Sequence, residues 1–239
     1  MWAMQNKIKL CISDLQIPFQ HQDALRFVLH VKKMLTRPGD IITIINMGDE
    51  VDQHTLSKYA SDPNGRSAGD ELHAAKMELK PWFAEFPQML ICESNHTYRA
   101  YKKGFEAGIP SEFFRSLNEV YGAPPRWRWQ NRWIIDGVLY EHGEGVSGVN
   151  AAITAAIHNQ MSTAIGHQHS NGGVQWSGSF GKNIFGLNTG CLIDVNAYAF
   201  KYGQKIRRKP TLGMGALYND IPLFIPMITN AQGRWVGYV

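Results

Sequence analysis

Short apolar runs separated by amphipathic stretches dominate the first part of the chain. Residues 7–13, 41–45 and 89–92 are rich in isoleucine, leucine and other apolar side chains, which is typical of buried strands. Residues 23–35 and 71–86 instead place apolar side chains at helical spacing. The alternation of strand and helix predicts an α/β fold built on an open sheet.

The pattern is less regular in the middle of the chain. An irregular insertion, basic and aromatic in composition, is predicted around 98–132, with a helix at 111–121 inside it. A strand at 133–140, an alanine-rich helix at 147–160 and a short strand at 163–165 follow. The small side chains of the alanine-rich helix suit close packing on a sheet.

The C-terminal part is β-like, with strands predicted at 174–176, 182–187, 223–228 and 234–239. Neither an internal repeat nor a low-complexity segment interrupts the pattern, and no stretch has the composition of an interdomain linker. We therefore expect one domain that covers residues 1–239.

Composition narrows the class of protein. Of the 239 residues, 44% are hydrophobic and 18% are charged, which favours a globular protein over a disordered one. No apolar run reaches the ~18 residues of a membrane span, and the N-terminus has no secretory signal pattern. The net charge of +4 is a mild excess, which fits an anionic substrate without establishing nucleic-acid binding.

The three cysteines, Cys11, Cys92 and Cys191, each lie in an apolar run and do not have the spacing of a metal finger. They are therefore predicted to be buried free thiols. Unpaired cysteines favour a reducing compartment, so the expected localisation is cytoplasmic.

Polar side chains follow most of the predicted strands, where α/β sheets form their sites. The residues that carry oxygen or nitrogen ligands come in this order: Asp14, Asp49, Asn95, His142, His167 and His169. Each motif alone recurs by chance, and a lone buried histidine is usually structural. The ordered series is what a two-metal hydrolase site needs, so the chemistry predicted is metal-dependent hydrolysis of a phosphoester.

The series also resembles a known family. Its blocks are Asp14-Leu15-Gln16, Gly48-Asp49-Glu50-Val51-Asp52, Ser94-Asn95-His96, His142 and Gly166-His167-Gln168-His169. Together they look like the calcineurin-like metallophosphoesterase superfamily. The resemblance implies a four-layer αββα sandwich of two mixed sheets, with two metals between the sheets.

The resemblance also implies a role for each matched residue. Asp49 would bridge two metals. The first metal would be bound by Asp14 and His169, with Gln16 beside them. The second metal would be bound by Asn95, His142 and His167. His96 would lie over the scissile phosphate as proton donor or charge stabiliser, oriented by Asp52. Mixed imidazole and carboxylate ligands suit two divalent transition metals, Mn first, with Fe, Ni or Zn as possible alternatives.

Two positions depart from the family pattern. Gln16 stands where the family usually has histidine, and a neutral carboxamide is a weaker ligand than imidazole for such metals. The first metal site is therefore expected to be weak. Thr97 stands where an acid usually follows the Asn-His pair, but that acid is not a core ligand. The second site looks intact.

Basic and aromatic residues near these motifs are candidates for substrate binding. Arg99 follows the His96 loop and could hold a phosphate, while His54 lies just past the Asp52 motif. Residues 126–133 alternate basic and aromatic side chains, which suits stacking with single-stranded nucleic acid or a β-hairpin edge packed on one face. The basic run 205–209 could extend an electrostatic track.

The function predicted is therefore that of a phosphodiesterase or nuclease acting on nucleic acid or a nucleotide through a two-metal-activated water. The alternatives are a phosphomonoesterase acting on a phosphoprotein or small nucleotide, and a catalytically weak scaffold protein. Retention of His96 and Asp52 argues against the scaffold, because a decayed site has no need for a non-ligating histidine. The sequence leaves the oligomeric state open.

Overall fold

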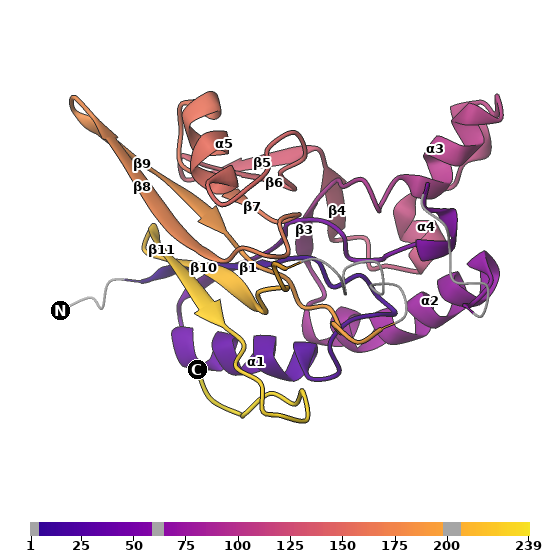
Figure 1. Ribbon diagram of the computed structural model, residues 1–239, viewed down its shortest axis with the longest axis horizontal. Coiled ribbons are helices and arrows are strands. Elements are labelled where there is room, and N and C mark those ends of the chain that lie inside the picture. Colours follow the sequence, from indigo (N-terminus) through magenta and orange to yellow (C-terminus); the bar gives the residue numbers. More distant parts are fainter. Residues whose placement is uncertain (1–4, 59–64, 198–206) are drawn as a thin grey trace.

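The computed structural model describes residues 5–58, 65–197 and 207–239. Two mixed β-sheets form the centre of the molecule, and helices lie on the outer face of each (Figure 1). The basic run predicted at 205–209 falls partly outside the described residues.

The first sheet has the strand order β11-β10-β1-β2-β3-β4. Strands β1 to β4 are parallel, and β10 and β11 extend the sheet antiparallel to β1. The bounds of its strands are β1 Lys7–Ile12, β2 Ile41–Asn46, β3 Met89–Cys92, β4 Trp127–Gln130, β10 Gly213–Tyr218 and β11 Ile221–Pro226.

The second sheet has the strand order β5-β6-β7-β9-β8. Its central strands β6, β7 and β9 are parallel, and the edge strands β5 and β8 pair antiparallel with their neighbours. The bounds are β5 Arg132–Ile135, β6 Val138–Glu141, β7 Thr163–Ile165, β8 Gly173–Ser179 and β9 Lys182–Asn188.

Helices connect the parallel strands and cover the sheets. Their bounds are α1 Ala24–Leu35, α2 Ala68–Glu85, α3 Arg99–Glu106, α4 Leu117–Tyr121 and α5 Ala151–Asn159, with short 3₁₀ turns η1 His54–Leu56 and η2 Ser111–Phe113. Thus α1 and α2 match the predicted helices to within a few residues.

Buried apolar clusters define four layers. The largest cluster joins the first sheet to α1, α2 and α4 and includes Leu10, Phe27 and Trp82. A second lies between the two sheets and includes Ile45 and Tyr140. A third packs the alanines of α5 on the second sheet. The predicted α/β sandwich of two mixed sheets is confirmed.

The predicted strand at 133–140 is wrong in one respect, because it consists of two strands. β5 and β6 pair antiparallel around Asp136 and Gly137, whose φ angles are 49° and 77°. An Asp-Gly pair between apolar runs is a strong hairpin signal, because a tight turn of this kind needs positive φ at both positions. The apolar run on either side concealed it.

The segment 98–132 is more regular than predicted. It contains α3, α4 and β4, and Ser116 begins α4 with a capping box shared with Glu119. The predicted helix at 111–121 is divided into η2 and α4. At the other end of the chain, the predicted strand at 234–239 is only an isolated bridge at Trp235, while β10 was missed.

The cysteines are buried and free, as predicted. Among the described residues, none of the helices has both the length and the apolar character that crossing a membrane requires.

Candidate metal centre

The predicted ligands lie just past the C-terminal ends of strands from both sheets. Asp14 follows β1, Asp49 follows β2 and Asn95 follows β3, while His142 follows β6 and His167 follows β7. Because parallel strands end at the same edge of a sheet, these side chains meet where the edges of the two sheets face each other.

The loops after β1 and β2 run side by side. The amide of Asp14 donates to the carbonyl of Gly48 at 3.1 Å, and the amide of Gln16 donates to the carbonyl of Asp49 at 2.8 Å. Asp14, Gln16 and Asp49 have φ angles of 49°, 48° and 54°. Non-glycine residues in the left-handed region are strained and cluster at functional sites.

Two glycines let the loops approach one another. A Cβ on Gly166 would lie 2.0 Å from Oγ of Ser13 and 2.7 Å from Oδ2 of Asp14. A Cβ on Gly48 would lie 2.8 Å from Nδ1 of His142, and the φ of Gly48 is 101°. Glycine is therefore required at both positions for the loop backbones to reach these distances.

The ligand atoms form two groups that share one residue. Asp49, His142 and His167 form one group, and Asp14, Asp49 and His169 form the other; within each group the ligand atoms lie within 4.8 Å of one another. Asp49 belongs to both, which is the position of a bridging carboxylate. The structure thus brings together the residues that the sequence placed in a two-metal site.

The group around His142, here the second cluster, is held by the backbone. Nδ1 of His142 lies 2.8 Å from the carbonyl oxygen of Met47. Its Nε2 is thereby directed toward Oδ1 of Asn95, 3.2 Å away, Oδ1 of Asp49, 3.4 Å away, and Nδ1 of His167, 3.1 Å away. A backbone acceptor on one ring nitrogen fixes the other for ligation.

The group around Asp14, here the first cluster, includes the carboxamide. Nε2 of His169 lies 2.9 Å from Oδ1 of Asp14. Nε2 of Gln16 lies 3.1 Å from Nε2 of His169 and 3.3 Å from Oδ2 of Asp49. Oε1 of Gln16 is buried and has no hydrogen-bond partner among the described residues, so a neutral oxygen donor remains for a cation.

Charge in the clusters favours a cation. Burial disfavours ionised carboxylates, but His169 lowers the pKa of Asp14, and His142 and His96 hold the pKa of Asp49 well below its usual range. Burial would also lower the pKa of His142, yet the Asp49 carboxylate raises it to about 10. Buried carboxylates need compensating positive charge, which protons or metal cations provide, so the donor set fits divalent metals.

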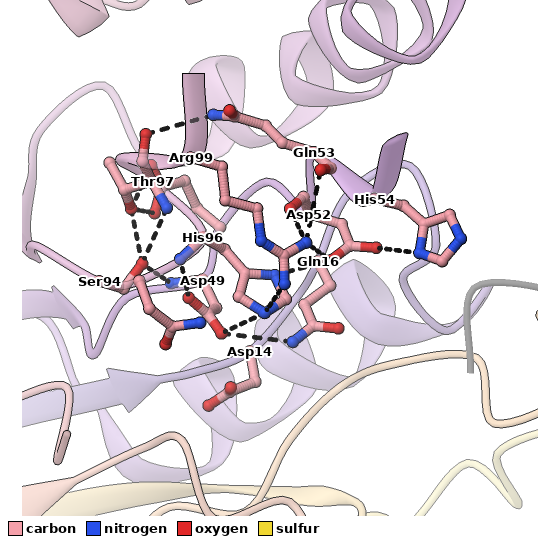
Figure 2. Close-up of polar contacts among 12 residues, drawn as sticks. Asp14, Gln16, Asp49, Asp52, Gln53, His54, Ser94, His96, Thr97 and Arg99 are labelled. Atoms are coloured by element: carbon pink, nitrogen blue, oxygen red, sulfur yellow. Dashed lines mark hydrogen bonds and ion pairs between the residues drawn. The ribbon is translucent and has the colours of Figure 1, made fainter. Parts of the chain in front are cut away.

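His96 lies beside the clusters in contact with Asp52 (Figure 2). Nδ1 of His96 is 2.6 Å from Oδ1 of Asp52, and Nε2 is 3.6 Å from Oδ2 of Asp49. Nη1 of Arg99 lies 2.8 Å from the carbonyl oxygen of Asp52 and 3.2 Å from its Oδ1. The predicted contact between Asp52 and His96 is therefore present.

The partners of His96 define its tautomer. Nη2 of Arg99 lies 2.7 Å from Nε2 of His96, and a guanidinium can only donate. Nε2 therefore accepts from Arg99, so in a neutral ring the proton is on Nδ1, the nitrogen that lies 2.6 Å from Oδ1 of Asp52. In this arrangement His96 is neutral, and donating a proton from Nε2 requires the imidazolium.

A buried network that the sequence did not reveal supports this loop. Oγ of Ser94 accepts from the amide of Asp49 at 3.0 Å and lies 2.7 Å from Oγ1 of Thr97. Thr97 donates in turn to the Glu50 carboxylate at 3.2 Å, which also accepts from Nε1 of Trp129 at 3.0 Å. Glu50 sits within the Gly-Asp motif, but its partners come from later segments.

Two histidines near the site differ in their surroundings. Nδ1 of His54 lies 3.9 Å from Oδ2 of Asp52, and its backbone amide donates to Glu71 at 2.6 Å, so His54 borders the site. His21 accepts from the amide of Asp23 at 3.0 Å and lies 2.7 Å from the carbonyl oxygen of Gly233. Both ring nitrogens of His21 are thus engaged in the C-terminal packing.

The tryptophans of residues 126–133 turn into the protein. Nε1 of Trp127 donates to the carbonyl of Phe86 at 2.7 Å, and Nε1 of Trp133 donates to that of Ile91 at 3.0 Å. With Trp129 bound to Glu50, all three indoles are anchored in the fold. Packing is thus favoured over stacking, but the predicted β-hairpin edge is wrong, because β4 and β5 belong to different sheets.

Comparison with known proteins adds a likeness to two solved structures. Vacuolar Protein Sorting 29 from Cryptosporidium parvum matches with a TM-score of 0.43 and 12% identity, over 93% of this chain and 97% of that chain. Vps29 from Chaetomium thermophilum matches with a TM-score of 0.42 and 13% identity, over 95% of this chain and 89% of that chain. No family model and no curated protein matches the sequence.

The layers and the ligand order define the class of protein. Two mixed sheets lie between outer helices, and the candidate ligands sit at the shared edge of the sheets in the predicted order. The chain therefore has a four-layer αββα sandwich fold with two candidate metal-ligand clusters that share Asp49.

Proposed function

We propose that the protein is a two-metal phosphodiesterase, acting on nucleic acid or a nucleotide. The observation that carries the proposal is the sharing of Asp49 by two ligand clusters, with the His96–Asp52 pair next to them. A purely structural cluster would need neither a shared carboxylate nor a histidine directed beside it.

The residues of each cluster would hold one cation. Asp14, Asp49 and His169, with Oε1 of Gln16, would hold the first, and Asp49, Asn95, His142 and His167 the second. When bound, divalent cations supply an activated water and neutralise charge on the phosphate oxygens. Mn is the leading candidate, with Fe, Ni or Zn as alternatives.

The other side chains near the clusters would bind the phosphate and donate a proton. Arg99 is the cation nearest to His96, so its guanidinium would bind a phosphate oxygen through charge-assisted hydrogen bonds. Movement of Arg99 onto the phosphate would release Nε2 of His96. Nε2 would then take up a proton from solvent, Asp52 would stabilise the resulting imidazolium, and the Nε2 proton would pass to the leaving oxygen, which returns His96 to the neutral form. His54, which borders Asp52, would lie on the substrate side.

The two alternatives differ in ester class and in activity. A phosphomonoesterase would use the same clusters on a terminal phosphate, and a scaffold would use the fold without turnover. The ordered contact of His96 with Asp52 favours an enzyme, while the carboxamide of Gln16 is the feature that favours a weak one.

Hydrolysis of bis-p-nitrophenyl phosphate and of p-nitrophenyl phosphate, measured with Mn, Ni, Zn and Mg, tests the proposal. We expect metal-dependent turnover that is faster on the diester. The matched control is Asp49→Asn, which removes the shared carboxylate charge while keeping side-chain size. Faster turnover of the monoester would favour the monoesterase. Equal rates for wild type and the Asp49 variant would favour the scaffold.

A further inference from the structure

A groove next to the candidate metal centre has the features of a base-binding subsite. It has a volume of about 380 Å³ and lies between α3, α4 and the end of β4. Glu93 and Tyr98 line it, and these two residues bracket the loop that carries Asn95 and His96. Because Tyr98 lines the groove and the next residue, Arg99, lies 2.7 Å from Nε2 of His96, the adjoining group of a ligand whose phosphate occupies the metal centre would lie toward the groove.

Aromatic rings form the wall of the groove. The ring centroids of Tyr98 and Tyr101 are 5.3 Å apart, and Phe114 lies 5.2 Å from both Tyr101 and Phe105. Phe105 is 53% exposed, so part of its ring is open to a ligand. Trp129 also lines the groove. Base–aromatic stacking needs surfaces of this kind.

The wall is held rigidly in place. The hydroxyl of Tyr101 donates to the carbonyl of Arg115 at 2.7 Å. A Cβ on Gly104 would lie 2.2 Å from Cζ of Phe114, so α3 packs directly on that ring. Because the wall is already ordered, a ligand would bind with little loss of side-chain freedom.

Polar groups on the rim of the groove indicate which kind of ligand it would bind. The Glu93 carboxylate can accept from the amino group of a base, and Arg115 supplies a cation. Arg99, the first residue of α3, lies against His96 and Asp52, where its guanidinium complements a phosphate. Planar faces, a hydrogen-bond acceptor and a cation on the phosphate side together match a nucleotide.

We propose that this groove binds the nucleobase of the phosphoester substrate; the proposal rests on the phosphodiesterase function above. The surface proposed for base stacking is thus the aromatic wall of the groove on α3 and not residues 126–133, whose indoles are anchored in the fold. The substrate class that follows is a nucleotide or a single-stranded nucleic acid whose terminal base enters the groove.

The test compares two phosphates that differ only in the base. Calorimetric titration of the Mn-loaded protein with adenosine 5′-monophosphate should give a Kd about tenfold below that for ribose 5-phosphate, a modest value for one stacked base. Phe105→Ala should abolish this difference while leaving binding of ribose 5-phosphate unchanged. Phe105→Leu, which keeps apolar volume without the planar face, should behave like the alanine variant.

Phe113→Ala is the matched control, because Phe113 is 78% exposed and does not line the groove. This variant should retain the tenfold preference. Equal affinity of the wild type for the two phosphates would overturn the proposal, as would an unchanged preference in both Phe105 variants.

The assay of nitrophenyl esters separates this result from the proposed function. If the diester is hydrolysed but the two phosphates bind equally, the proposed base subsite is contradicted and the proposed phosphodiesterase function stands. A tenfold preference for the nucleotide without any metal-dependent turnover would remove the phosphodiesterase and leave a nucleotide-binding protein.

Discussion

The two ends of the sheets both contain buried charged residues, but these charges are balanced in different ways. At the C-terminal ends of the parallel strands, buried carboxylates face imidazoles, and residues such as Asp49 adopt positive φ. At the opposite end, Lys9 is 2% exposed and lies 2.8 Å from Asp136 and 2.6 Å from Asp220. The candidate ligands at the first end fit a bound cation, whereas at the opposite end the cation is the side chain of Lys9.

The difference teaches which buried charges indicate function. Lys9 forms ion pairs with Asp136 in the turn of the β5–β6 hairpin and with Asp220 in the turn of the β10–β11 hairpin, so each of these three charges has a partner of opposite sign within the fold. At the candidate centre, Oε1 of Gln16 has no partner among the described residues. Positive φ occurs at both ends, at Asp49 and also at Asp136 and Asp220, so the unmet bonding capacity of Gln16 is what distinguishes the candidate centre.

The largest effect is expected from the carboxylate that both clusters share. Asp49→Asn should remove bound metal from both clusters and lower diester turnover beyond the ~10–100-fold that loss of an outer partner costs. Elemental analysis and turnover are the measurements, and Lys9→Met is the control from the opposite end. Retention of metal in the Asp49 variant would contradict its bridging position.

The second effect concerns proton donation. His96→Ala should leave metal content unchanged and lower turnover of nucleotide diesters by at least ~100-fold, the lower range for losing a general acid. The loss should be smaller on nitrophenyl diesters, because activated nitrophenolate leaves without a proton. A variant equally impaired on both substrates would indicate charge stabilisation instead.

A smaller effect compares the two clusters with each other. Metal titration of the wild type should show two unequal affinities, because a carboxamide donates more weakly than an imidazole. Gln16→His should strengthen the weaker site, whereas Asn95→Ala should weaken the other. Two equally tight sites in the wild type would show that Gln16 does not limit the first cluster.

The smallest effect on activity is expected at the opposite end. Asp136→Asn combined with Asp220→Asn leaves the Lys9 cation without a carboxylate, so the free energy of unfolding should fall, by less than the ~3 kcal/mol of a fully buried pair because both carboxylates are partly exposed to solvent. Turnover per folded molecule should not change. Lys9→Met removes the buried charge altogether, and its effect on unfolding should stay within about 1 kcal/mol.

The stabilisation from the Lys9 ion pairs changes with pH in a direction that follows from the pKa of Lys9. Burial lowers the pKa of Lys9, but Asp136 and Asp220 outweigh burial and raise it above 10.5. The stabilisation is therefore fully present below about pH 10.5 and is lost as the pH rises through the folded-state pKa. Denaturant unfolding of wild type and of the double variant should converge above that pH, and a constant difference would contradict this account.

Local signals made much of the fold predictable. Apolar runs placed β1, β2 and β3, helical spacing placed α1 and α2, and the order of polar motifs placed the candidate ligands at strand ends. The Asp136-Gly137 turn was also readable, but a continuous apolar run on both sides hid it. β10 was missed because its sequence, with two glycines and one methionine, contains none of the β-branched residues that mark a strand.

Other features depended on contacts between distant segments. The Glu50–Thr97–Ser94 network joins the loops after β2 and β3, and Trp129 reaches it from β4. The Arg99 contact that makes His96 neutral likewise requires the start of α3 to face the Asp52 loop. Residue types alone do not specify such pairings.

The sequence by itself predicted candidate metal ligands, because carboxylate and imidazole side chains in this order are typical of a metal centre. Only the tertiary structure decided which candidate ligands lie together, which tryptophans are anchored and where an aromatic groove opens. The physical reason is that ligand type is a local property, whereas distance and burial are set when loops from two sheets pack together.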